Sequence, residues 1–120
     1  MHDALAIEGG FADPVTAGQR AFKAVMDALA RPGTLQRLPG EASPPTPLPP
    51  GLAEIALTLC DHESPVWLDA DLVSENAVLE WVRFHTGATL VNEPERADFA
   101  FVTTTLPALS SFALGSDEYP

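Results

Sequence analysis

Apolar residues recur at helical spacing in the first third of the chain, at Val15, Phe22, Val25, Met26 and Leu29. Asp13 can cap the start of such a helix, and Pro14 suits its first position, where the missing N–H costs nothing. The chain leaves the helical region at Arg31, because the residue before Pro32 is sterically restricted. The pattern predicts a helix over residues 14–30.

Two further segments show the same spacing, and turn-forming residues separate them. A second helix is predicted over residues 51–60 and a third over residues 72–84, where Gly87 breaks the pattern. The apolar residues that repeat in these segments are Leu52, Ile55, Ala56, Leu59, Leu72, Leu79, Trp81 and Val82. Pro107 can open a last short helix that Gly115 stops.

Short apolar segments between the helices are typical of strands. Residues 65–68, 88–91 and 99–102 read in this way, and residues 34–38 are compatible with a fourth short strand. The segment at 99–102 is apolar enough to be central in a sheet. Residues 39–51 include six prolines and favour an extended surface connection. This alternation predicts an α/β fold, a mixed layered sheet with flanking helices.

The length of 120 residues suits one domain, which would bury roughly two-thirds of its unfolded surface. Residues 1–9 are expected to form a mobile tail, and residues 10–120 to form the N-terminal part of a single α/β domain. Residues 115–120 have turn chemistry that leads into a further element. We therefore expect an incomplete domain, whose exposed sheet edge would need a partner.

The chain is strongly acidic, with 17 Asp and Glu against six Lys and Arg and a net charge of −11. Nucleic acid and anionic membranes are disfavoured as partners, since binding to either depends on basic side chains. An acidic surface suits solubility or docking on a basic protein. No apolar run approaches the roughly 20 residues of a membrane span, and no signal peptide is recognisable. The expected location is the cytoplasm.

The densest candidate chemistry lies at the end of the third predicted helix. Arg83, His85 and Thr86 bring a guanidinium, an imidazole and a hydroxyl together just before Gly87. Arginine binds phosphate-like oxyanions in a bidentate manner, and histidine donates protons or hydrogen bonds near neutral pH. These three residues form a candidate phosphate or phosphonate site. Alternatively, Arg83 and His85 satisfy the carbonyls and dipole of a helix C-terminus.

Other reactive side chains have simpler explanations. Cys60 is expected to be a small buried hydrophobe. Asp61, His62 and Glu63 are metal-ligand types, but adjacent side chains diverge, so Asp61 is interpreted as a turn residue and no metal is expected. Lys23 is the only lysine and lies on the polar side of its helix, so a Schiff base with pyridoxal phosphate is not expected. No nucleotide-loop, nucleophile-elbow or zinc-protease motif occurs, so the catalytic residues are unknown.

Several short segments occur in a specific order along the chain. They are residues 10–15 (GFADPV), 19–22 (QRAF), 30–33 (ARPG), 57–61 (LTLCD), 64–68 (SPVWL), 83–88 (RFHTGA) and 97–100 (ADFA), followed by Gly115. Taken together, these segments resemble one family, the H subunit of the bacterial carbon–phosphorus lyase complex. Each motif is weak alone, but the ordered set is specific. It covers nearly the whole chain after residue 9. Family members are considerably longer, so the resemblance is to their N-terminal part.

The resemblance implies a fold similar to pyridoxal-phosphate-dependent transferases, without the cofactor or its lysine. It implies a homodimer that joins the G, I and J subunits. With G and I, the H subunit supports attack of an alkylphosphonate on ribose C1 of ATP, displacing adenine and forming a ribose 1-alkylphosphonate 5-triphosphate. The alternatives are a phosphate- or nucleotide-binding enzyme component that uses Arg83 and His85, and an unrelated α/β interaction module.

Overall fold

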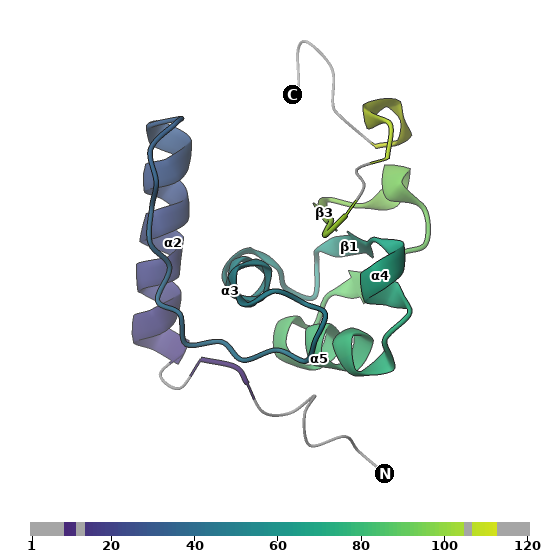
Figure 1. Cartoon of the computed structure of the whole chain (residues 1–120), viewed down its shortest axis with the longest axis horizontal. Coiled ribbons are helices and arrows are strands. Elements are labelled where there is room, and N and C mark those ends of the chain that lie inside the picture. Colours follow the sequence, from purple (N-terminus) through teal and green to yellow (C-terminus); the bar gives the residue numbers. More distant parts are fainter. Residues whose placement is uncertain (1–8, 12–13, 105–106, 113–120) are drawn as a thin grey trace.

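The computed structural model describes residues 9–11, 14–104 and 107–112 of the chain. The elements are α2 (Pro14–Ala30), α3 (Pro50–Leu59), β1 (Pro65–Leu68), α4 (Ala70–Val73), α5 (Asn76–Thr86), β2 (Thr89–Leu90), the 3-10 helix η1 (Pro94–Arg96), β3 (Phe99–Phe101) and the 3-10 helix η2 (Leu109–Ser111). Figure 1 shows α2 outermost, with α3 between it and the small sheet. The predicted α/β class is confirmed.

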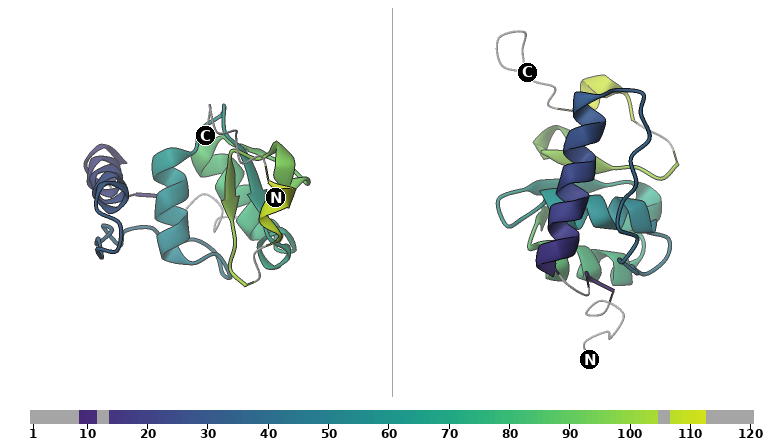
Figure 2. Two further views of the ribbon diagram at one scale, coloured as in Figure 1. Left: turned by 90° about the horizontal axis from the view of Figure 1, so that it is seen from above. Right: turned by 90° about the vertical axis from the view of Figure 1, so that its left-hand side faces the viewer.

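Helix α2 has the predicted bounds but buries a different face from the one that its large apolar residues mark. Ala17, Ala21 and Ala24 are at most 8% exposed, and α2 packs on α3. These small side chains allow two helices to approach closely. The large residues instead face outward and are 38–69% exposed, at Val15, Phe22, Met26 and Leu29. The left view in Figure 2 shows this helix on the outside of the molecule, beside α3 and away from the sheet.

Replacing Gly18 of α2 and Gly87 at the end of α5 by alanine should change the free energy of unfolding in opposite directions. Gly18 lies inside α2 with open space around it, so Gly18→Ala should raise the free energy of unfolding by about 0.5–1 kcal/mol. Gly87 caps α5 at a φ of 72°, where a Cβ is disfavoured, so Gly87→Ala should lower it by about 1 kcal/mol. Urea unfolding of both variants tests this prediction. Shifts of the same sign would contradict it.

The described sheet has three strands in the order β2-β1-β3. Val66 of β1 pairs with Leu90 on one side and with Phe99 on the other, and both ladders are parallel. The expected mixture of strand directions is therefore wrong for the described strands. Strand β1, and not the segment at 99–102, takes the central position, because it alone has a neighbour on both sides. Val66 and Leu68 are accordingly at most 4% exposed.

The single helix predicted over residues 72–84 is wrong, because the chain forms two helices there. Helix α4 ends at Val73, and Glu75 is extended, with φ −106° and ψ 110°, before α5 begins. The apolar residues keep helical spacing across this break because α4 and α5 bury them in the same core. Leu72, Trp81 and Val82 are all at most 2% exposed, as the apolar stripe predicts.

The possible strand at residues 34–38 does not form, although the segment is extended beside α2 (Figure 1). No described strand pairs with it, so it lacks the neighbour that a strand requires. A buried carboxylate fixes its far end instead. Glu54 of α3 is 2% exposed, and its Oε1 accepts the backbone N–H of Gly40 at 2.8 Å. The proline-rich connection that follows contributes Ala42 and Leu48 to the core.

The two ends of the chain are only partly described. The last predicted helix, opening at Pro107, is represented by the single turn η2, and its expected end at Gly115 lies outside the described residues. Residues 1–8 of the expected tail also lie outside them. The carbonyl of Gly9 accepts the N–H of Ser43 at 2.8 Å. None of the helices in the described part is sufficiently long and apolar to cross a bilayer.

Candidate functional site

Thr86, the most buried of the predicted phosphate-site residues, terminates helix α5. Its hydroxyl donates to the Val82 carbonyl at 2.6 Å and accepts the N–H of Ala88 at 3.0 Å. The N–H of Gly87 bonds to the Arg83 carbonyl at 2.9 Å. Thr86 is 9% exposed, so its side chain is engaged with the backbone at the helix end.

His85 is half-buried among aromatic rings. Its ring centroid lies 4.6 Å from that of Trp81 and 5.0 Å from that of Phe84. A Cβ on Gly10 would come within 2.9 Å of the ring, so the N-terminal segment covers it closely. Its Nε2 is buried and has no hydrogen-bond partner among the described residues. The imidazole therefore packs like an apolar ring and leaves one polar atom unused.

Arg83 is exposed at the surface of α5. It precedes His85 by two residues, which places the two side chains about 200° apart around the helix. The described structure therefore does not bring Arg83 and His85 together around one anion. Neither of the hollows described below includes any of the three predicted residues.

The acidic turn after α3 is built as the sequence suggested. Asp61 Oδ1 accepts the N–H of Glu63 at 2.8 Å and the hydroxyl of Ser64 at 3.2 Å, which closes the turn before β1. His62 points into solvent with its side chain 82% exposed. Within the described residues, no group of three or more potential ligand side chains is placed to hold a metal ion.

Cys60 is 7% exposed and packs in the core, which confirms it as a buried hydrophobe. Burial, together with the smaller effect of the neighbouring Asp61 charge, raises the pKa of its thiol to about 11. The thiol is thus protonated at neutral pH. Because the thiolate is the nucleophilic form, the side chain is unsuited to attack on a substrate.

Asp69 and Thr103 lie where parallel strands end, the usual place for ligand sites in α/β folds. Asp69 follows β1 and Thr103 follows β3, but the Asp69 carboxylate is already occupied. Its Oδ1 accepts the N–H of Leu72 at 3.1 Å, and its Oδ2 accepts the N–H of Thr103, its hydroxyl at 2.8 Å and the N–H of Thr104 at 3.3 Å. This constellation holds the sheet edge together.

The balance of two opposing effects sets the acidity of Asp69. Burial alone would raise the pKa of this carboxyl, which is 3% exposed. The hydrogen bonds from Thr103, Leu72 and Thr104 act against burial and hold the pKa below its ordinary value. Asp69 is therefore a carboxylate at neutral pH and is not suited to be a general acid.

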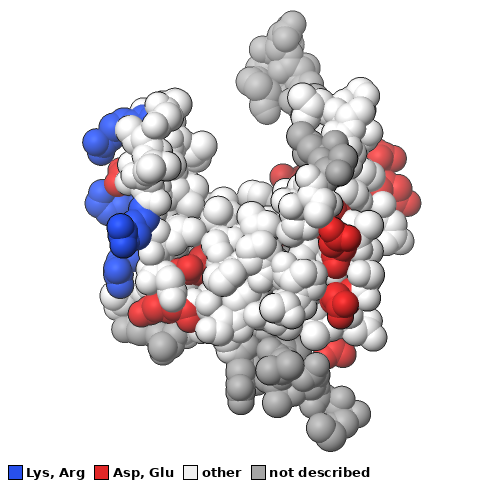
Figure 3. Space-filling model, viewed as in Figure 1, with Lys and Arg blue, Asp and Glu red and all other residues white. Residues whose placement is uncertain are grey.

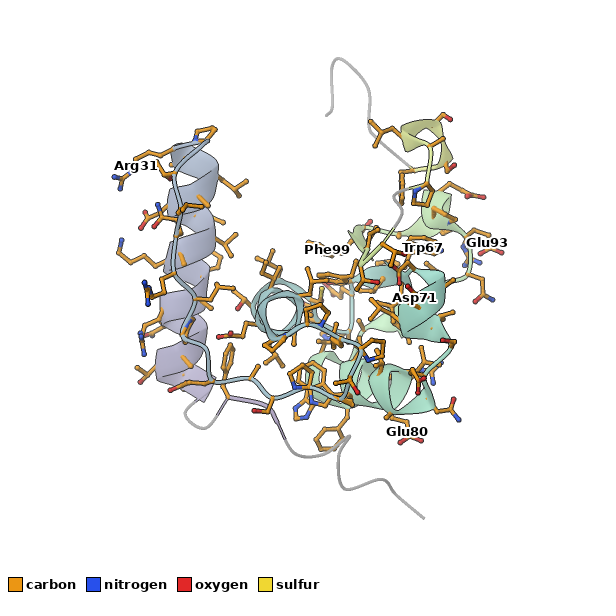
Figure 4. The ribbon with its side chains drawn as sticks, viewed as in Figure 1. Arg31, Trp67, Asp71, Glu80, Glu93 and Phe99 are labelled. Atoms are coloured by element: carbon orange, nitrogen blue, oxygen red, sulfur yellow. The ribbon has the colours of Figure 1, made fainter. Side chains whose placement is uncertain are left out.

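The basic side chains are unevenly distributed. Residues 14–40 carry four of the six Lys and Arg but only one of the 17 acidic residues. Figure 3 shows the Lys and Arg side chains gathered over α2, with most of the visible acidic side chains elsewhere. In Figure 4, Arg31 points outward from the end of α2, whereas Asp71 and Glu93 lie across the molecule. The acidic surface expected from the net charge is therefore interrupted by a basic face.

That basic face contains a hollow of about 230 Å³ between α2 and the segment that follows it, here called the basic hollow. Its lining comprises Arg20, Lys23, Ala24, Asp27, Gln36, Arg37 and Pro39. Lys23 donates to Asp27 Oδ2 at 2.7 Å, and this bond is the main reason that the pKa of Asp27 is lowered. Three basic side chains from two segments thus surround one carboxylate.

A second, apolar hollow of about 160 Å³ lies on the other flank of α2. Val25 and Ala28 of α2, Leu38 of the returning segment and Ile55 of α3 line it together with Ala24 and Gln36. The two hollows thus share Ala24 and Gln36 and lie on either side of the returning segment. Nothing in the described structure covers the apolar one.

Sequence reasoning missed the basic hollow, although a signal was present. Arg20, Lys23, Arg31 and Arg37 fall within 18 consecutive residues of a chain with a net charge of −11. The whole-chain charge concealed this cluster, since a total says nothing about position. Arg37 joins Arg20 and Lys23 only because the chain turns back after α2, where Thr34 bonds to the Arg31 carbonyl.

Two comparisons with known proteins agree with the ordered motifs. The family model described as bacterial phosphonate metabolism protein (PhnH) matches residues 9–120. The alpha-D-ribose 1-methylphosphonate 5-triphosphate synthase subunit PhnH of Rhizobium meliloti (strain 1021) is 45% identical over 114 residues. That match covers 93% of this chain and 56% of the relative, so the chain spans about half the length of the curated relative.

Proposed function

The chain belongs to the PhnH family of bacterial phosphonate metabolism proteins, and we propose that it is part of a subunit of an alpha-D-ribose 1-methylphosphonate 5-triphosphate synthase. The observation that carries this proposal is the 45% identity to the Rhizobium meliloti subunit across 93% of the chain. Insertions or losses that removed whole elements would have shortened such a match. The described helices and strands all fall inside the residues that the family model covers.

The proposed reaction belongs to the carbon–phosphorus lyase system for alkylphosphonate breakdown. An oxygen of the alkylphosphonate forms a bond to ribose C1 of ATP while the bond from C1 to the adenine nitrogen breaks. Adenine leaves with a proton, and the product is a ribose 1-alkylphosphonate 5-triphosphate. The chain's part is support of this transfer within a complex. The engaged carboxylate of Asp69 and the protonated thiol of Cys60 agree with a role that is not catalytic alone.

The proposed partners are the G, I and J subunits of the complex and a second copy of the protein, in the cytoplasm. The proposed fold of the whole protein is similar to that of pyridoxal-phosphate-dependent transferases, without the cofactor. Lys23 is the only lysine in this sequence that could form a Schiff base with such a cofactor. Its side chain is 75% exposed and paired with Asp27 on the surface of α2.

Growth and co-purification test the proposal together. We expect deletion of the gene to abolish growth on methylphosphonate as the sole phosphorus source, and growth on phosphate to continue. The full-length protein should co-purify with the G and I subunits, because a supporting subunit acts only when assembled. Normal growth of the deletion strain on methylphosphonate, or a full-length protein that never joins G and I, would contradict the proposal.

A second candidate is direct phosphate or phosphonate binding by Arg83, His85 and Thr86. The unused Nε2 of His85 and the exposed guanidinium of Arg83 favour it. Because the two side chains diverge on α5, binding would require a ligand that passes around the helix end. Calorimetry of the variant Arg83→Gln with tripolyphosphate tests this site.

A further inference from the structure

The basic hollow concentrates basic side chains in a chain that is otherwise acidic. Arg20 and Lys23 are three residues apart on α2, so they share one face of the helix. Arg37 reaches the same hollow from the extended segment that runs back beside α2. Within the described residues, Lys23 is paired with Asp27, whereas Arg20 and Arg37 take part in no ion pair. Two exposed guanidinium groups are thus available to an anion.

The segment that carries Arg37 is fixed at both ends, which makes the hollow a defined feature. At its start, the Thr34 hydroxyl donates to the Arg31 carbonyl at 2.7 Å, and Gln36 Nε2 donates to the Thr34 hydroxyl at 3.0 Å. At its end, Gly40 donates to the buried carboxylate of Glu54 at 2.8 Å. Arg37 therefore projects from a tethered backbone, and less order has to be imposed when a ligand binds.

The size of the hollow limits what it can hold. Its volume of about 230 Å³ is below the roughly 300–1,000 Å³ of pockets that enclose a drug-sized molecule. A phosphate group or a short phosphate chain fits this limit better than a whole nucleotide. Guanidinium groups match the geometry of phosphate oxygens, to which they donate paired hydrogen bonds. The single carboxylate, Asp27, opposes an anion but is already neutralised in part by Lys23.

We propose that the basic hollow binds the phosphate chain of an anionic small molecule, with Arg20 and Arg37 as the main donors and Lys23 beside them. The hollow's charge and size define this ligand class. Identification of the ligand with the triphosphate of the synthase reaction rests on the proposed function. The site lies on α2 and the segment after it, away from the candidate residues on α5.

Calorimetry with tripolyphosphate, ATP and adenosine tests the proposal on the wild-type chain. Tripolyphosphate and ATP should bind, and adenosine should not, because the hollow recognises the phosphates. Added salt should weaken binding, since exposed charges are screened within about 10 Å at 0.1 M. The variants Arg20→Gln and Arg37→Gln should each lower the affinity for tripolyphosphate about tenfold, the effect of losing roughly one charge-assisted contact.

Arg96→Gln is the matched control, because it makes the same change of charge on an exposed arginine. Arg96 Nη1 lies 3.5 Å from Glu93 Oε2, and Figure 4 shows Glu93 across the molecule from α2. This variant should change the affinity less than twofold. A larger loss with Arg83→Gln than with Arg20→Gln and Arg37→Gln would place the binding on α5 and overturn the proposal. Equal losses from all four variants would overturn the proposal, and so would full binding by Arg20→Gln and Arg37→Gln. Circular dichroism checks folding, and Arg37→Lys, which keeps the charge, should retain part of the affinity.

Co-purification of the same variants separates this proposal from the proposed function. If the site binds phosphate chains, Arg20→Gln and Arg37→Gln in the full-length protein should still join the G and I subunits. Loss of assembly with unchanged tripolyphosphate binding would show that the basic face docks an acidic partner, which overturns the proposal. Failure of the wild-type protein to assemble would contradict the proposed function and leave the calorimetric result valid.

Discussion

Replacing Trp81 by alanine is expected to lower the free energy of unfolding by about 3–5 kcal/mol. Trp81 lies on α5, is fully buried and is the largest fully buried side chain of the described core. Its ring packs 4.6 Å from that of His85, and a Cβ on Gly9 would come within 3.3 Å of its Nε1. The substitution therefore leaves a large cavity where a helix and the N-terminal segment meet. Urea unfolding followed by circular dichroism measures the loss.

The second tryptophan provides the control. Trp67 of β1 is only partly buried, and its ring meets Phe112 edge-on at 5.9 Å. Trp67→Ala removes the same atoms from a more open site, so it should cost clearly less than Trp81→Ala. Trp81→Phe should recover part of the lost stability, because it refills part of the cavity. Equal unfolding midpoints for Trp81→Ala and Trp67→Ala would show that the fully buried Trp81 contributes no more to stability than the partly buried Trp67.

The longest periodic segment was the easiest to predict. The helix at 14–30 has both a start signal at Pro14 and a stop signal at Pro32, and it appears with its predicted bounds. Periodicity did not identify its buried face. Ala21 is fully buried, whereas Phe22 is 50% exposed, because close approach to α3 favours small residues. That choice depends on a neighbouring helix and is invisible in a local pattern.

Outside α2, the sequence predicted which residues are buried better than it predicted whether a helix is continuous or whether a strand has a partner. The apolar residues on both sides of Glu75 keep helical spacing, although the backbone breaks there. Spacing reports which residues share a core and does not report whether one helix connects them. The segment at 34–38 had a strand-like composition but lacks a described partner, and hydrogen bonds to a distant strand cannot be read locally.

The candidate site residues show the same contrast between local geometry, which the sequence predicts, and placement in the fold, which it does not. Local geometry was predictable: Asp61 closes its turn and Cys60 is buried. The basic hollow needs Arg37 to return beside Arg20, which follows from the turn after α2. The placement of Arg83 and His85 depends on their angle around α5, and a run of suitable residue types did not reveal that the two diverge.

Replacing Asp69 by asparagine should cost roughly 3 kcal/mol at neutral pH, because a buried charged acceptor is lost. All four groups that meet this carboxylate are donors, on Leu72, Thr103 and Thr104. An asparagine has only one side-chain oxygen, and its amide group would face a donor on the other side. The contact between the end of β1 and the chain after β3 would be lost. Asp71→Asn, an exposed change in the first turn of α4, is the control and should have a much smaller effect.

The same carboxylate predicts a direction for the pH dependence. The pKa of Asp69 is lower in the folded protein than its unfolded value of about 3.9, so folding favours the ionised form. The contribution of ionised Asp69 to the free energy of unfolding is complete well above that unfolded pKa. It disappears as the pH falls through the folded pKa. Urea unfolding at several pH values between 7 and 3 should show the gap between wild type and Asp69→Asn narrowing towards the acid end. A gap that stays constant or widens would mean that the hydrogen bonds to Asp69 do not depend on its charge, and the sheet edge would then be held by packing alone.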